Sequence, residues 1–174
     1  MNTVTVFDFE TYMAEDGSVP KAVVCAVKRG NEPSALYLPA DVLPLLWDAM
    51  QNGDTLVAHH APFDLAVLLE TAVALLTPKE ALRYRSAVWK HLNDGLVSCS
   101  RVRSLLISIA DGSMQGVRPI AHSLDAVVMR LLGQDISAGK KGPDSWRTRY
   151  AELDGVSLAE YPAEARDYPL WTWT

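Results

Sequence analysis

Features that mark several specialised protein classes are missing from this sequence. Only two of its 174 residues are cysteines, Cys25 and Cys99, and neither has a partner residue at metal-ligand spacing. They predict two buried free thiols in a reducing compartment. The longest apolar run, residues 65–76, is interrupted by Glu70 and is too short to cross a bilayer. The first ten residues lack the basic and apolar regions of a signal peptide. We therefore expect a cytoplasmic protein that is not embedded in a membrane.

An excess of positive charge is also missing. The formal net charge is −5, which by itself argues against a nucleic-acid partner. The charges are unevenly distributed, however, because residues 79–150 hold six acidic and twelve basic side chains, whereas residues 1–78 hold ten acidic and three basic ones. The sequence thus predicts an acidic region beside a basic one, and its net charge does not exclude nucleic acid.

The remaining composition is that of one globular domain over residues 1–174, with 49% hydrophobic and 21% charged residues. Runs of β-branched and aromatic residues predict strands at residues 3–9, 22–27, 35–38, 55–59 and 96–100. Apolar periodicity predicts helices at residues 41–51, 61–76, from 78 onwards and 123–132, and residues 101–110 fit a strand end or a helix. This order predicts an α/β fold in which helices flank a mixed sheet of about five strands.

Two carboxylates end the first predicted strand. Asp8 and Glu10 are two residues apart, so they lie on the same face of the strand, and Phe7 and Phe9 point the other way into a core. Adjacent negative charges are tolerated at a strand end when solvent or a divalent cation relieves their repulsion. A solvated rim and a metal site are both compatible with this pair.

A third carboxylate, Asp64, ends the segment AHHAPFD at residues 58–64, where a strand passes into a helix. Its place in the first helical turn complements the helix dipole, which alone would account for it. Both acidic segments nevertheless follow apolar strands, and ligands gather at the carboxyl ends of strands in α/β sheets. We expect the three carboxylates to converge on one rim, and such oxygen ligands favour Mg²⁺ or Mn²⁺.

These segments resemble the motifs of a known superfamily. FDFET at residues 7–11 and AHHAPFD resemble the first two motifs of the DEDD 3′–5′ exonucleases. Residues 144–170 resemble the approach to the third motif in the proofreading exonuclease domains of bacteriophage family A DNA polymerases, and residues 122–133 are similar to the helix before it. The resemblance spans nearly the whole chain. It implies a ribonuclease H-like fold and two-metal hydrolysis of phosphodiesters at a DNA 3′ end, in a bacterial or phage-infected cell.

The resemblance also implies a role for each motif residue. Asp8 would bridge two divalent cations, Mg²⁺ or Mn²⁺, Glu10 would bind one and help orient the attacking water, and Asp64 would hold the second. Tyr168 would orient that water, which is the pattern of the tyrosine (DEDDy) subclass. An ordinary half-buried tyrosine remains the alternative for Tyr168.

Candidate substrate-binding side chains flank these motifs. By resemblance, Thr11 and Phe63 would contact the terminal nucleotide, and His60, which stands where an asparagine is usual, still offers a hydrogen-bond donor. His59 is expected to face the opposite side of the strand. Basic residues interleaved with aromatic ones are a general means of holding a single-stranded end. The candidates here are Arg103, Lys140, Lys141 and Arg147, interleaved with Trp146 and Tyr150. For each of them, a place on a solvated helix face is the alternative.

The third motif departs from the family pattern. It should end in an aspartate four residues after Tyr168, but Thr172 stands there. Either the chain is a truncated or altered product with weakened catalysis, or Asp167 or Glu164 substitutes as a ligand. We expect a DNA 3′–5′ exonuclease of reduced activity. Two alternatives stay open: a catalytically inactive module that binds single strands or a DNA polymerase, and an RNA-trimming exoribonuclease.

Overall fold

A five-stranded mixed sheet forms the centre of the computed structural model, which describes residues 3–15, 17–115, 121–136 and 145–170. The strands lie in the order β3-β2-β1-β4-β5. Neighbouring strands are antiparallel from β1 to β3 and parallel from β1 through β4 to β5. This arrangement is consistent with a ribonuclease H-like fold, and it confirms the predicted α/β class and strand number. The bounds are β1 (Val4–Thr11), β2 (Ala22–Arg29), β3 (Ala35–Tyr37), β4 (Thr55–Ala58) and β5 (Val97–Cys99).

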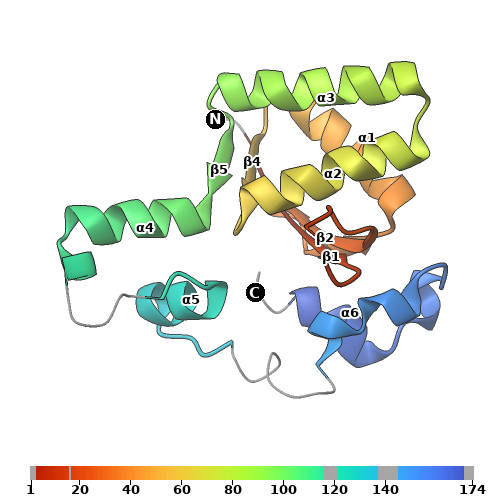
Figure 1. Ribbon diagram of the computed structural model, residues 1–174. Helices are drawn as coiled ribbons and strands as arrows, with labels where there is room; N and C mark the ends of the chain where they lie inside the picture. Colours follow the sequence, from red (N-terminus) through yellow and green to blue (C-terminus); the bar gives the residue numbers. More distant parts are fainter. Residues whose placement is uncertain (1–2, 16, 116–120, 137–144, 171–174) are drawn as a thin grey trace.

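Helices cover both faces of the sheet (Figure 1). One face carries α1 (Pro39–Gln51), α2 (Ala61–Leu75) and α3 (Pro78–Asn93). The opposite face carries α6 (Ala163–Leu170) and three short 3-10 helices, η3 (Trp146–Thr148), η4 (Tyr150–Leu153) and η5 (Leu158–Glu160). Beside the sheet lie α4 (Ser100–Ala110), η1 (Ser113–Gln115) and α5 (Leu124–Leu132), so the ambiguous segment at 101–110 is a helix.

The larger core fills the space between the sheet and helices α1 to α3. Phe7 and Phe9 alternate inward along β1, as their spacing predicts, and their rings meet edge to face with centroids 6.1 Å apart. Leu46 from α1 and Leu68 from α2 are fully buried against them. Since Phe7 and Phe9 point into this core, the intervening Asp8 and the following Glu10 face the other side of the sheet.

A second core lies on the opposite face of the sheet. Val23 and Val24 of β2 pack there with Tyr150, Tyr161 and Ala165, which come from the last third of the chain. The strand β2 is therefore buried on both faces. Among the described residues, neither core includes a side chain from α4 or α5.

Several local signals in the sequence also appear in the structure. Thr77 and Glu80 form a capping box at the start of α3, and Pro62 lies in the first turn of α2. Both cysteines are free thiols, and Cys25 is buried as predicted, whereas Cys99 is only half-buried because it ends the edge strand β5. No helix within the described residues has the length and apolar character needed to cross a membrane.

Candidate active site

The carboxyl end of β1 runs past its parallel neighbour β4. The paired register with β4 ends at Val6, whereas pairing with β2 continues to Thr11. Asp8 and Glu10 therefore lie along an edge that β4 leaves uncovered, and both side chains are half-buried. The chain leaves β4 at Ala58 and enters α2 at Ala61, so α2 begins beside this edge.

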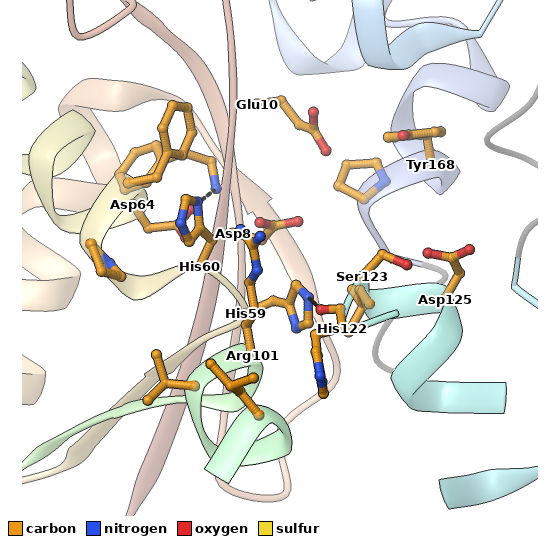
Figure 2. A pocket seen from close by; sticks show the side chains of 17 residues that line it. Asp8, Glu10, His59, His60, Asp64, Arg101, His122, Ser123, Asp125 and Tyr168 are labelled. Carbon is orange, nitrogen blue, oxygen red and sulfur yellow. Dashed lines mark hydrogen bonds between the residues drawn. The ribbon is translucent and has the colours of Figure 1, made fainter. Parts of the chain in front are cut away.

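A cavity of about 850 Å³ lies at this edge of the sheet. Figure 2 shows Asp8 and Glu10 from β1, Asp64 from α2, Asp125 from α5 and Tyr168 from α6 around the same space. Asp8, Glu10 and Asp64 therefore line one cavity, together with Tyr168 from a segment more than 100 residues further along the chain.

Asp64 is the most deeply buried of these carboxylates, with 2% of its surface exposed. Its Oδ1 accepts a hydrogen bond from the backbone N–H of Phe9 at 3.2 Å. Burial, and after it the charge of Asp8, raise the pKa of Asp64 to about 8, against the opposing effect of the Phe9 amide. A divalent cation between Asp8 and Asp64 would relieve this repulsion and favour both charged forms.

The residues at the cavity fit a cation that prefers oxygen ligands. Four carboxylates line it, those of Asp8, Glu10, Asp64 and Asp125, which is the donor type that Mg²⁺ and Mn²⁺ favour. Within the described part of the chain, no three His, Cys, Asp or Glu side chains are already grouped as ligands of one ion. The carboxylates share a cavity rather than a preassembled cage, and the metal site stays a prediction.

Tyr168 reaches the cavity from α6, with Tyr150 packed behind it. The two ring centroids are 6.1 Å apart with planes inclined by 57°. Burial, and to a smaller extent the charge of Glu10, raise the pKa of Tyr150 far above its ordinary value. Tyr150 is fully buried, so its interpretation as a ring that stacks on a base is wrong. Trp146 is half-buried, with the guanidinium of Arg149 4.6 Å from its ring centre.

Two of the predicted substrate-binding residues line the cavity. The rings of His60 and Phe63 stack there, with centroids 6.2 Å apart and planes inclined by only 7°. Burial and the nearby charge of Arg101 lower the pKa of His60, which favours its neutral form. Aromatic surfaces of this kind accept a nucleobase by stacking.

The other predicted contacts are either absent from the cavity lining or outside the described residues. Thr11 is not part of the cavity lining, and its hydroxyl donates to the carbonyl of Tyr12 at 2.7 Å. Arg103 is exposed on α4 away from the lining, where Arg101 is present instead. Lys140, Lys141 and the side chain of Arg147 lie outside the described residues, as does Thr172.

His59 lines the same cavity as His60, so the expectation that they face opposite sides is wrong. The chain has already left β4 at Ala58, and the strand alternation no longer holds there. His59 Nε2 lies 3.1 Å from the carbonyl oxygen of His122, and Nδ1 lies 2.9 Å from Ser100 Oγ. The carbonyl only accepts, so Nε2 donates to it, and in the neutral ring the Ser100 hydroxyl donates to Nδ1. This side chain thus connects the end of β4 to the starts of α4 and α5.

Sequence reasoning missed one acidic residue of the cavity and two of its polar neighbours. Asp125 and Ser123 belong to the segment HSLD at the start of α5, next to His122. The sequence places Asp125 in the first turn of a predicted helix, but an acid at that position is typical of any helix start and does not indicate a site. Glu164 and Asp167, the proposed substitutes for the missing aspartate, are exposed on α6 and are not among the lining residues.

Comparisons with protein-family models, with curated proteins and with solved structures found no match. The functional interpretation therefore depends on the residues of the cavity and on their motif spacing.

Proposed function

We propose that the protein is a metal-dependent 3′–5′ exonuclease of the DEDD type, which hydrolyses phosphodiester bonds at DNA 3′ ends. The observation that carries this proposal is the shared cavity of Asp8, Glu10, Asp64 and Tyr168. These residues come from three separate elements, β1, α2 and α6, and they are the ones that the resemblance assigns to catalysis. The position beyond the carboxyl ends of parallel strands also favours a ligand site.

Each side chain has a defined role in this proposal. Asp8, Glu10 and Asp64 hold divalent cations, Mg²⁺ or Mn²⁺. Bound there, the cations would supply a deprotonated water and stabilise the departing 3′ oxygen. Glu10 and the hydroxyl of Tyr168 orient the attacking water beside the scissile phosphate. The hydrogen bond from Phe9 to Asp64 keeps the carboxylate of α2 fixed relative to those of β1.

The remaining lining residues support a single-stranded end as the substrate. The stacked rings of His60 and Phe63 provide an apolar surface for the terminal base. Arg101, which also lines the cavity, provides a positive charge for a backbone phosphate. By its resemblance to proofreading domains, the protein has a DNA polymerase as its proposed partner.

A catalytically inactive module that binds single strands is the second candidate, and Thr172 favours it. Threonine is neutral and a poor ligand for Mg²⁺, so a cation held by Asp8 and Glu10 would lack one charged partner. Glu164 and Asp167 do not compensate for it, because neither lines the cavity.

Strand degradation separates the two candidates. A 5′-labelled single strand, as DNA and as RNA, is incubated with the protein or its Thr172→Asp variant in Mg²⁺, Mn²⁺ or a chelator. Stepwise shortening of DNA by the parent protein supports the exonuclease, and faster shortening of RNA supports the exoribonuclease instead. Shortening by Thr172→Asp alone supports the inactive module. The absence of shortening by either protein in both metals contradicts the proposal.

A further inference from the structure

We infer that Tyr150 is a positioning residue, which holds Tyr168 at the cavity wall by replacing a helix hydrogen bond that Pro169 removes. The inference rests on the proposed function, in which Tyr168 orients the attacking water. It concerns a residue that the motif resemblance leaves without a role.

Pro169 lies inside α6, directly after Tyr168. In an α-helix the amide of residue 169 donates to the carbonyl of residue 165. Proline has no amide hydrogen, and its ring also pushes that carbonyl away from the helix axis. The carbonyl of Ala165 is therefore left without its i+4 donor, at a residue that is fully buried and out of reach of bulk water.

The hydroxyl of Tyr150 supplies the missing donor. It donates to the carbonyl oxygen of Ala165 at 2.8 Å. Tyr150 is 0% exposed and is held in the second core, so the position of its hydroxyl is set by packing. Its ring also packs against that of Tyr168. One side chain thus supports both the backbone that precedes Tyr168 and the Tyr168 ring.

This support matters because α6 has only eight residues and an interrupted hydrogen-bond pattern. A helix of this length has little stability of its own and depends on tertiary contacts. Loss of the Tyr150 hydroxyl would free the last turn of α6 and displace Tyr168. His60, Phe63 and Arg101 come from the start of α2 and from α4, so substrate binding would be preserved while the orientation of the water would not.

The first experiment compares Tyr150→Phe with a matched control, Tyr84→Phe. Tyr84 is 3% exposed, and its hydroxyl donates to the carbonyl of Leu43 at 2.9 Å in the other core. Each variant loses one buried hydroxyl-to-carbonyl hydrogen bond, so both should lower the melting temperature by similar amounts. Tyr150→Phe is expected to lower kcat about tenfold with KM within about twofold, since it misplaces a reacting group. Tyr84→Phe should leave both constants unchanged. Equal kcat values for the two variants would overturn the inference.

The second experiment restores the missing amide. In a Pro169→Ala background, the backbone N–H of residue 169 becomes available to the Ala165 carbonyl. Tyr150→Phe should then lower kcat by less than about twofold, because the two changes act on the same hydrogen bond. A full loss of kcat in both backgrounds would show that Tyr150 acts by another route. If only Thr172→Asp degrades strands, all of these variants are made in that protein.

Hydrogen exchange of the peptide spanning residues 163–170 separates this inference from the proposed function. Exchange is expected to be faster in Tyr150→Phe than in Tyr84→Phe, and this difference should disappear in the Pro169→Ala background. This result would support the inference that the Tyr150 hydroxyl replaces the missing amide of residue 169, even if no strand is degraded. In that case the proposed function fails while the support of α6 by Tyr150 stands. Unchanged exchange in Tyr150→Phe overturns the inference whether or not the protein is a nuclease.

Discussion

The backbone amide of Phe9 donates a hydrogen bond to Asp64 Oδ1 over 3.2 Å. Phe9 lies between Asp8 and Glu10, so this bond fastens the strand with two carboxylates to the helix with the third. The Phe9 ring is only 5% exposed and is packed in the larger core. Folding therefore fixes Asp64 relative to the strand that carries Asp8 and Glu10. Within the described residues it does not group the three carboxylates as ligands of one ion.

Asp64→Asn should separate the proposed metal-binding role of Asp64 from its structural role. Asparagine keeps an oxygen for the Phe9 amide and removes an ionisable carboxyl group that is buried beside Asp8. We expect an unchanged or higher melting temperature, with affinity for Mn²⁺ reduced about tenfold or more by calorimetric titration. Asp41→Asn, which changes an exposed acid in the first turn of α1, is the control and should retain Mn²⁺ binding. Equal Mn²⁺ affinity in Asp64→Asn and the parent would contradict this role.

Arg101→Ala and Arg103→Ala form a second matched pair. Both arginines are exposed at the start of α4, but only Arg101 lines the cavity. Arg101→Ala should weaken binding of a labelled single strand and reduce the slope of log affinity against log salt by about 0.7, the value for one lost phosphate contact. Arg103→Ala should change the slope little. Fluorescence anisotropy at several salt concentrations measures both, and similar slopes for the two variants would be evidence against the assigned phosphate contact.

His59→Asn and His59→Gln test how α5 is attached. The longer glutamine side chain can still donate to the His122 carbonyl, whereas asparagine reaches only the position of Nδ1. No described side chain of α5 belongs to either core, although Val127 is buried and Arg130 donates to Ser104 on α4. The bond from His59 is therefore expected to contribute to the placement of α5 together with these contacts. Hydrogen exchange over residues 124–132 should increase in His59→Asn, and strand binding should fall about fivefold, as for one ordinary hydrogen bond. Glutamine should restore both, and identical behaviour of the two variants would refute this attachment.

Thr77→Ala should destabilise the protein without changing the cavity. Thr77 Oγ1 accepts from the Glu80 amide at 3.4 Å, and the Glu80 carboxylate accepts from the Thr77 amide at 3.0 Å. Removal of the cap should lower the free energy of unfolding by about 1 kcal/mol in urea titration. Ser86→Ala is the control in the same helix: it removes an exposed hydroxyl that bonds Leu82 and should cause no loss. A loss as large in Ser86→Ala would assign the effect to the helix rather than to its cap.

Patterns confined to a few residues predicted the sheet well. The alternation of Phe7 and Phe9 with Asp8 and Glu10 predicted which face of β1 is buried, and the structure confirms it. Residues 101–110 were ambiguous because Val102, Ile107 and Ile109 suit a strand, yet the segment is a helix. The hydrogen bonds and contacts of the folded chain outweigh the strand propensity of these residues.

Relationships between distant segments could not be predicted in this way. Tyr150 lies among basic and aromatic residues, as a base-stacking side chain would. Its burial depends on the packing of η4 against β2, which the local sequence does not indicate. Arg101 and Arg103 are equivalent in the sequence, and the direction in which α4 leaves β5 decides which one lines the cavity. The place of Asp125 in the cavity likewise depends on the path of the chain between α4 and α5.

The most direct test is the rate at which nucleotides are removed from the 3′ end of a 5′-labelled single strand in Mn²⁺. The rate is measured for the parent or the Thr172→Asp protein, whichever is more active, and for the same protein carrying Asp8→Ala. Asp8→Ala should reduce this rate about a thousandfold or more while the fold is retained, because Asp8 is the carboxylate that both cations would share. Asp41→Ala, an exposed acid on α1, should leave it unchanged. Degradation that continues undiminished in Asp8→Ala would show that the cavity is not a two-metal nuclease site.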